Sequence, residues 1–298
     1  MNESNLDGVI VVDKPIDWTS HDVVAKMRGI AGTRRVGHLG TLDPIATGVL
    51  PVMIGNVTRL AQFWDKAEKT YDAAIRFGYA TTTYDRAGER VGEKIVPTLS
   101  ADAIEALLAP MRGEIEQVPP PVSAKKIGGV PAYKLVRQNI PVELKAVRVT
   151  LKELVLTGVE GPLIQLHVRC TSGTYIRAIA HDLGRQLGCG AHIEELVRTE
   201  SGPFRIGQAR TLEQLQLLKA EGRLAEALVS AEELLPAFPS VFIDDLTRRH
   251  IRQGRDFNAS PFRIQPGTEY VKAIGPDGGL VAIGKIVLAH VYHPIVVI

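Results

Sequence analysis

Residues 34–48 combine reactive side chains with glycines, which allow backbone conformations that a Cβ would block. The stretch reads RRVGHLGTLDPIATG, with two adjacent arginines, one histidine, one carboxylate and three glycines. It has neither a helical nor an alternating apolar period, which predicts an ordered loop rather than a helix or strand. Asp43 precedes Pro44, so its backbone is driven toward extended geometry and its carboxylate is presented from a stiff turn. Such a carboxylate could act on an anionic substrate, although aspartate is also a common turn or capping residue.

The stretch from Gly37 to Pro51, GHLGTLDPIATGVLP, resembles the signature of the TruB family of tRNA pseudouridine-55 synthases. In that family the aspartate of this motif is the essential catalytic residue, which implies this role for Asp43. The resemblance also implies that His38, the histidine of the motif, fills the gap that the target base leaves in its stack. The alternative for His38 is a hydrogen bonder behind the site.

Further motifs follow in the family's order over roughly Gly8 to Gly202. The tyrosine of the family's Lys-x-Tyr stacks on the target base, which implies that role for Tyr71; a tyrosine at the start of a strand is otherwise a packing residue. The segment GTYIR supplies Arg177, expected to pair with the catalytic aspartate, and Tyr175, expected to line the same pocket. Leu196 occupies the position of a pocket leucine. Asp17 stands where the family usually has glycine, and aspartate tolerates a left-handed backbone better than most residues.

The resemblance implies conversion of uridine 55 in the TΨC loop of tRNA to pseudouridine. The uracil is detached from C1′ of its ribose, rotated and rejoined through C5, so no atoms are gained or lost and no cofactor is required. The sequence contains no Walker loop, dinucleotide fingerprint or metal-ligand cluster. A base inside a folded loop must be flipped into a pocket before it can react. There, an adjacent guanidinium such as Arg177 would keep Asp43 ionised.

Three alternatives remain open from the sequence. One is a non-catalytic tRNA-binding or tRNA-folding protein on the same fold, which would bind tRNA without forming product. Another is a hydrolase that uses Asp43, but glycosidase chemistry normally needs two opposed carboxylates, and no second motif acid stands out. The third is an RNA-guided synthase of the same superfamily. The short tail and the absence of large basic extensions favour a standalone enzyme over this alternative.

Composition adds limits on location and partners. The chain has 298 residues, is 45% hydrophobic and 23% charged, and carries a net charge of +2, which alone predicts no nucleic-acid partner. Residues 121–155 hold seven Lys or Arg against two acids, a local excess that could neutralise phosphates. Cys170 and Cys189 match no metal or disulfide spacing. With no signal peptide and no apolar stretch of about 20 residues, we expect a cytoplasmic monomer that contacts no membrane.

The expected fold is α+β, a pseudouridine-synthase fold with a mixed, mostly antiparallel sheet flanked by helices. Periodicity predicts strands at Lys69–Phe77, Arg148–Leu156 and Leu163–Cys170 and helices at Val57–Ala67, Ala101–Met111 and Ile176–Leu187. We assign residues 1–238 to the catalytic domain, with an RNA-gripping thumb insertion at about 115–145 that includes a short helix at Tyr133–Arg137, and two helical pieces in Thr211–Leu235.

Residues 239–298 resemble a PUA domain, a small β-rich RNA-binding module. Short β-rich runs at Tyr270–Ile274, Leu280–Ile283 and Ile286–Val291 predict its strands. Four arginines that recur every three or four residues predict one basic helical face ending at Gly254; they are Arg248, Arg249, Arg252 and Arg255. The implied partner is tRNA, bound at the T-arm by the catalytic domain and at the acceptor stem by this tail.

Overall fold

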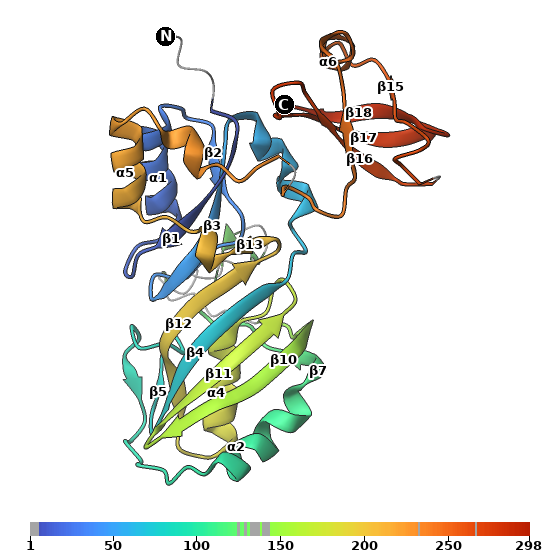
Figure 1. Cartoon of the computed structure of the whole chain (residues 1–298). Coiled ribbons are helices and arrows are strands. Elements are labelled where there is room, and N and C mark those ends of the chain that lie inside the picture. Colours follow the sequence, from blue (N-terminus) through green and yellow to red (C-terminus); the bar gives the residue numbers. More distant parts are fainter. Residues whose placement is uncertain are drawn as a thin grey trace.

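Two β-sheets organise the protein (Figure 1). The computed structural model describes residues 6–123, 126–127, 130–131, 138, 144–231, 233–265 and 267–298. Within these residues a large mixed sheet with packed helices is followed by a smaller five-stranded sheet near the C-terminus. The α+β class and the C-terminal β domain are therefore confirmed. No helix in this part of the chain is long and apolar enough to cross a membrane.

The large sheet places the middle of the chain beside its N-terminal third. Its main path runs β1-β3-β12-β4-β11-β10-β7. These strands are β1 (Gly8–Lys14), β3 (Ala46–Ile54), β12 (Ala191–Ser201), β4 (Lys69–Phe77), β11 (Leu163–Cys170), β10 (Val147–Glu160) and β7 (Gly113–Gln117). Neighbours on this path are antiparallel except β12 and β3, whose parallel pairing sets Leu196 opposite Ala46. The short strands β2 (Val36–His38) and β13 (Phe204–Arg205) extend it beside β3 and β12.

Helices cover the sheet with the apolar faces that their spacing predicts. Helix α1 (Ser20–Ala31) begins at a capping box between Thr19 and Asp22 and buries the stripe that includes Val23 and Met27. Helix α5 (Leu212–Ala220) packs against α1, α4 (Ile176–Gln186) against β12, and α2 (Ala101–Leu108) against β10. The turn before α1 uses Asp17 at φ 64°, the left-handed backbone expected where the family has glycine.

Most elements match the expected ones, and four differ. The helix expected at Val57–Ala67 is the 3₁₀ helix η1 (Gly55–Phe63), and the second helical piece before Leu235 is only η4 (Leu224–Ala227). The loop expected over residues 34–48 contains β2 and the start of β3. The strand expected at Ile286–Val291 is wrong, because β17 (Leu280–Leu288) continues and the chain turns at His290, with φ 59°. The helix expected at Tyr133–Arg137 lies outside the described residues.

The C-terminal sheet has the order β14-β16-β17-β18-β15. Its strands besides β17 are β14 (Ser240–Phe242), β15 (Phe257–Asn258), β16 (Tyr270–Ile274) and β18 (Val291–Val297). The basic segment forms α6 (Asp245–Arg252), which ends before Arg255. The helix therefore carries three of the four arginines that the sequence places on one face.

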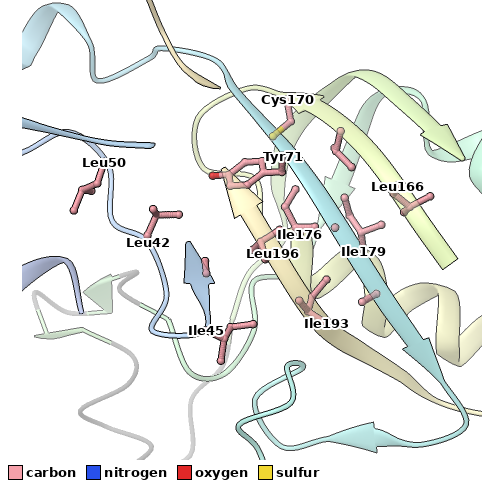
Figure 2. Packing of buried hydrophobic residues seen from close by; sticks show 14 of the residues in the cluster. Leu42, Ile45, Leu50, Tyr71, Leu166, Cys170, Ile176, Ile179, Ile193 and Leu196 are labelled. Carbon is pink, nitrogen blue, oxygen red and sulfur yellow. The ribbon is translucent and has the colours of Figure 1, made fainter. Parts of the chain in front are cut away.

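Strand β1 is buried on both sides, so the sheet separates two apolar clusters. Ile10 and Val12 belong to the larger cluster, which Figure 2 shows around Tyr71 and Leu196. Val9 and Val11 belong to the second cluster, which also contains Ile283 and Val296 of the C-terminal sheet. Burying one such side chain stabilises a fold by about 1.5–3 kcal/mol. The C-terminal sheet is thus held against the large sheet by a shared core.

Candidate active site

A pocket of about 230 Å³ lies between the 40–43 loop, the start of β4, the turn before α4 and the middle of β12. This volume is below the roughly 300–1,000 Å³ of pockets for drug-sized ligands, so it suits a single small group. Five of the six expected site residues line it: Asp43, Tyr71, Tyr175, Arg177 and Leu196. His38 is the exception.

Hydrogen bonds to the residues before and after Asp43 hold the loop that carries it. Leu42 exchanges two hydrogen bonds with Ser20, the first residue of α1: its N–H donates to Ser20 Oγ at 2.9 Å and its carbonyl accepts from that hydroxyl at 3.3 Å. Pro44 contributes a carbonyl that accepts from the N–H of Asp17 at 2.8 Å and from Lys14 Nζ at 3.2 Å. The carboxylate is therefore presented by a backbone with little freedom.

Lys14 is a fully buried ammonium that supports this loop. It also donates to the carbonyl of Trp18 at 2.6 Å and to that of Pro15 at 2.8 Å. Burial lowers the pKa of Lys14 to about 8, and the nearby charge of Asp43 opposes that shift. Lys14 thus joins the end of β1, the turn before α1 and the residue after Asp43.

Arg198 holds the loop from the other side. It is fully buried, and it donates to the carbonyls of Val49 at 2.8 Å, Gly40 at 3.0 Å and Thr41 at 3.4 Å. The close approach of β12 to β3 requires Gly48, because a Cβ there would lie 2.3 Å from the Arg198 carbonyl oxygen. Burial lowers the pKa of Arg198, and the neighbouring Tyr71 phenol opposes this shift.

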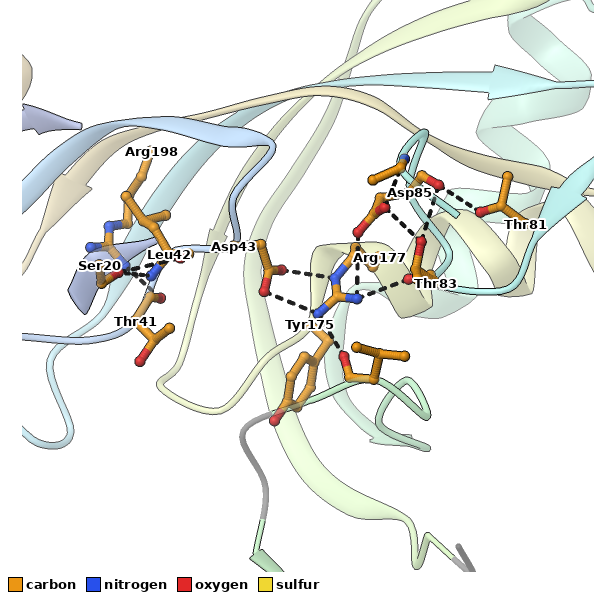
Figure 3. A network of polar contacts seen from close by, with 12 residues as sticks. Ser20, Thr41, Leu42, Asp43, Thr81, Thr83, Asp85, Tyr175, Arg177 and Arg198 are labelled. Carbon is orange, nitrogen blue, oxygen red and sulfur yellow. Dashed lines mark hydrogen bonds and ion pairs between the residues drawn. The ribbon is translucent and has the colours of Figure 1, made fainter. Parts of the chain in front are cut away.

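Arg177 lies at the centre of the polar network (Figure 3). Its Nε lies 2.8 Å from Asp43 Oδ2, and its Nη2 donates to Oδ1 at 3.1 Å, so the guanidinium grips both carboxylate oxygens. Its side chain is 5% exposed and that of Asp43 is 34% exposed. The remaining donors reach the carbonyls of Thr83 at 2.8 Å and Val122 at 3.1 Å. The arginine is thus buried and fixed, while the aspartate keeps an open side toward the pocket.

A second carboxylate belongs to this network and was missed from the sequence. Asp85 Oδ2 lies 3.5 Å from Arg177 Nη1, and its side chain is 7% exposed. Its Oδ1 accepts from Thr83 Oγ1 at 2.6 Å and from the Ala87 N–H at 3.0 Å. Asp43 and Asp85 are both bound to the one guanidinium, and so they are not the two opposed acids of a glycosidase. The run of three threonines before Asp85 was the only available signal.

Tyr71 and Leu196 combine core packing with the pocket wall. They are 7% and 5% exposed and belong to the main apolar cluster (Figure 2). Burial raises the pKa of Tyr71, and the adjacent Arg198 guanidinium opposes that shift. Burial likewise raises the pKa of Tyr175, the residue that precedes α4. Both phenols are therefore neutral near pH 7, and they offer the pocket aromatic surface and weakly acidic hydroxyls.

His38 lies at the end of β2, outside the pocket lining. Its ring meets His21 edge-on, with 5.7 Å between ring centroids. Burial lowers the pKa of His38 to about 4, with the charges of His21 and Arg198 acting in the same direction. A neutral imidazole at this position can stack or donate one hydrogen bond, and the expected stack-filling role remains a prediction.

Within the described part of the chain, no three His, Cys, Asp or Glu side chains come close enough to hold a metal ion. Cys170 is buried, and burial raises the pKa of its thiol to about 11. The pocket therefore offers one partly open carboxylate, a fixed guanidinium and aromatic surface.

Comparisons with known proteins find related sequences over nearly the whole chain. The sequence model "TruB family pseudouridylate synthase (N terminal domain)" matches residues 28–176, and "tRNA pseudouridylate synthase B C-terminal domain" matches residues 177–236. The tRNA pseudouridine synthase B of Solibacter usitatus is 58% identical, covering 98% of this chain and 100% of that protein. The protein of the same name from Thermobifida fusca is 42% identical, covering 94% of each.

Two solved structures share the fold over nearly the whole chain. A crystal structure of a Cbf5-Nop10-Gar1 complex contains a chain with a TM-score of 0.69 and 28% identity, covering 96% of this chain and 80% of that one. A structure of an H/ACA RNP bound to a substrate RNA containing 2′-deoxyuridine gives a TM-score of 0.68 and 27% identity, with the same coverage. Both likenesses extend beyond residue 236, where the family matches end.

Proposed function

Because the chain belongs to the TruB family of pseudouridylate synthases and forms pseudouridine in tRNA, we propose that its target is uridine 55 in the TΨC loop. The observation that carries the proposal is the Asp43–Arg177 ion pair at a pocket walled by Tyr71 and Leu196. A uracil cannot reach Asp43 while it is stacked in a folded loop, so it enters the pocket flipped out of the RNA.

The residues that line the pocket bind and orient the flipped base. Tyr71 offers an aromatic face, and stacking of a base on such a face stabilises single-stranded complexes by about 1–3 kcal/mol. Leu196 and Tyr175 close the pocket on other sides, and His38 fills the gap that the base leaves in the RNA stack. These contacts hold the ribose C1′ within reach of Asp43.

The reaction moves one glycosidic bond. The N1–C1′ bond breaks, the uracil turns within the pocket, and a C5–C1′ bond forms; C5 loses a proton and N1 gains one, so the net change is an isomerisation. Asp43 takes part either as a nucleophile at C1′ or as a base toward the sugar. Both routes use the Asp43 carboxylate, which the two contacts from Arg177 hold in place.

The surface supplies contacts for the rest of the tRNA. The basic insertion between β7 and β10 and the exposed arginines of α6 can neutralise phosphates. The insertion thus grips the T-arm as a thumb at about residues 115–145, and residues 239–298 act as a PUA-like domain on the acceptor stem. The protein works as a cytoplasmic monomer, and the catalytic domain is residues 1–238.

Pseudouridine mapping of an unmodified tRNA transcript tests the function. Wild-type protein should modify uridine 55 without an added cofactor, whereas Asp43→Asn should bind the tRNA and form no product. Substantial turnover by Asp43→Asn would remove this carboxylate from the central role. If neither protein modified uridine 55 while both bound the transcript, the non-catalytic tRNA-binding function would replace the proposal.

A further inference from the structure

Gln117 is a buried carboxamide at the end of an edge strand of the large sheet. It is the last residue of β7 and is 1% exposed, whereas Glu114 and Glu116 on the same strand face solvent. Its Nε2 donates to the Tyr175 carbonyl at 3.0 Å, and its Oε1 accepts from the Tyr175 N–H at 2.8 Å. The side chain thus satisfies both backbone groups of Tyr175, a residue 58 positions away along the chain.

These two bonds fix the start of the helix that carries Arg177. Tyr175 precedes the first residue of α4, and this helix has no side-chain cap at its N-terminus. The Tyr175 carbonyl also accepts from the N–H groups of Ala178 at 3.1 Å and Ile179 at 3.4 Å, which begin the helical ladder. Gln117 therefore fixes the backbone of the N-cap residue itself, and the first helical turn, with Arg177, takes its position from that residue.

The residues after Gln117 touch the same two pocket residues. The Val122 carbonyl accepts from Arg177 Nη2 at 3.1 Å. Ser123 is 4% exposed and lies beside the phenol of Tyr175. Pro119 and Pro120 between them are buried, whereas Val118 is exposed. The segment 117–123 is thus anchored at Gln117, at the two prolines and at Ser123. The next strand among the described residues, β8 (Lys126–Ile127), lies within the basic insertion.

We infer that Gln117 is a positioning residue that couples the base of this insertion to the Asp43–Arg177 ion pair. This inference rests on the proposed function, because it assigns Gln117 an effect on the same reaction. RNA held by the insertion and the guanidinium beside Asp43 are then positioned by one short segment, 117–123, whose two end residues are buried. A displacement of reacting groups by about 1 Å can reduce a rate by roughly 100-fold, so loosening this segment should slow the reaction more than it weakens binding.

Gln117→Met removes both hydrogen bonds at nearly constant side-chain length. We expect its single-turnover rate at saturating tRNA to fall roughly 10- to 100-fold, with the tRNA dissociation constant within about threefold of wild type. Gln117→Glu keeps an acceptor for the Tyr175 N–H and loses the donor, so it should fall between wild type and Gln117→Met. Glu114→Met, at an exposed position of the same strand that precedes the insertion, should match wild type.

The outcomes separate this inference from the function on which it rests. If wild type forms no pseudouridine, the proposed function fails; if wild type is active and Gln117→Met retains its rate, only the coupling fails. Equal losses of rate and of tRNA affinity would also overturn it, because they would place Gln117 in RNA binding. If Gln117→Met does not fold, a folded Gln117→Glu with the wild-type rate at saturation would reject the inference, and one with a reduced rate and unchanged affinity would support it.

Discussion

Replacing Asp85 by Asn tests whether the second carboxylate orients Arg177. The asparagine keeps Oδ1, which accepts from Thr83 Oγ1 and the Ala87 N–H. It changes only the oxygen that lies 3.5 Å from Arg177 Nη1 into an amide nitrogen, which cannot accept from the guanidinium. The local turn should therefore survive while one charged contact is lost.

The size of the effect follows from the geometry of that contact. At 3.5 Å, two unit charges attract by on the order of 5 kcal/mol at an effective dielectric constant near 20. Both side chains are largely buried, so desolvation offsets much of this attraction. We expect a net loss of about 2 kcal/mol in the transition state, which corresponds to a rate about 30-fold lower.

Single-turnover pseudouridine formation at saturating tRNA measures this loss directly. Asp85→Asn should react about 30-fold more slowly than wild type, with little change in the tRNA dissociation constant. Asp72→Asn is the matched control, because that carboxylate is 57% exposed and pairs with His167 at 2.7 Å on the open side of β4. An Asp85→Asn rate within about threefold of wild type, at unchanged affinity, would refute the orienting role.

Two further predictions concern Lys14 and α6. Since the pKa of Lys14 is lowered from 10.5 to about 8, the unfolded chain keeps this proton between those values while the folded chain has lost it. The free energy of unfolding of wild type should then rise relative to Lys14→Met by on the order of 1 kcal/mol per pH unit from about pH 8 to 10; urea denaturation measures it, and parallel pH profiles would contradict it. Arg249 and Arg252 are exposed on α6, so replacing both by Gln should weaken tRNA binding and reduce the slope of log affinity against log salt by about 1–2. An unchanged slope would exclude them from phosphate contact.

Substitution on α6 is preferable to deletion of the C-terminal sheet. Ile283 and Val296 share an apolar cluster with Val57 and Leu60 of η1. Arg59 also donates to the Val297 carbonyl at 3.0 Å. Deleting residues 239–298 would expose this cluster, so lost activity could reflect lost stability rather than lost RNA contact.

Local signals were sufficient to predict much of the fold. The apolar stripe of α1, the capping serine of α2 and the alternation of β10 and β11 each depend on neighbouring residues. The wrong predictions concern the distinction between an α-helix and a 3₁₀ helix, and a strand whose end is set by tertiary contacts. Residues 57–67 have a helix-like composition but form a 3₁₀ helix ending at Phe63, and β17 continues past the expected break because it pairs with β18. Neither the helix type nor the end of the strand can be predicted from the neighbouring residues alone.

Site residues could be predicted only where a motif named them. The resemblance supplied the five residues that the structure brings into one pocket. Asp85 and Gln117 were not identified, because each acts through a partner far away in the sequence: Asp85 through Arg177, and Gln117 through Tyr175. In the sequence, Asp85 and Gln117 cannot be distinguished from ordinary surface residues. Only the folded structure shows that both are buried next to α4.

The turn that carries Asp85 shows how the fold sustains this arrangement. Tyr84, between Thr83 and Asp85, has φ 65°, a left-handed conformation that costs an ordinary residue about 1–2 kcal/mol. That bend allows the Thr83 carbonyl and the Asp85 carboxylate to face the same guanidinium. The Tyr84 ring stacks on His181, with centroids 3.8 Å apart and planes 10° from parallel. Because His181 lies one turn after Arg177 on α4, the helix that presents the arginine also supplies the contact that offsets the strain of the loop binding it.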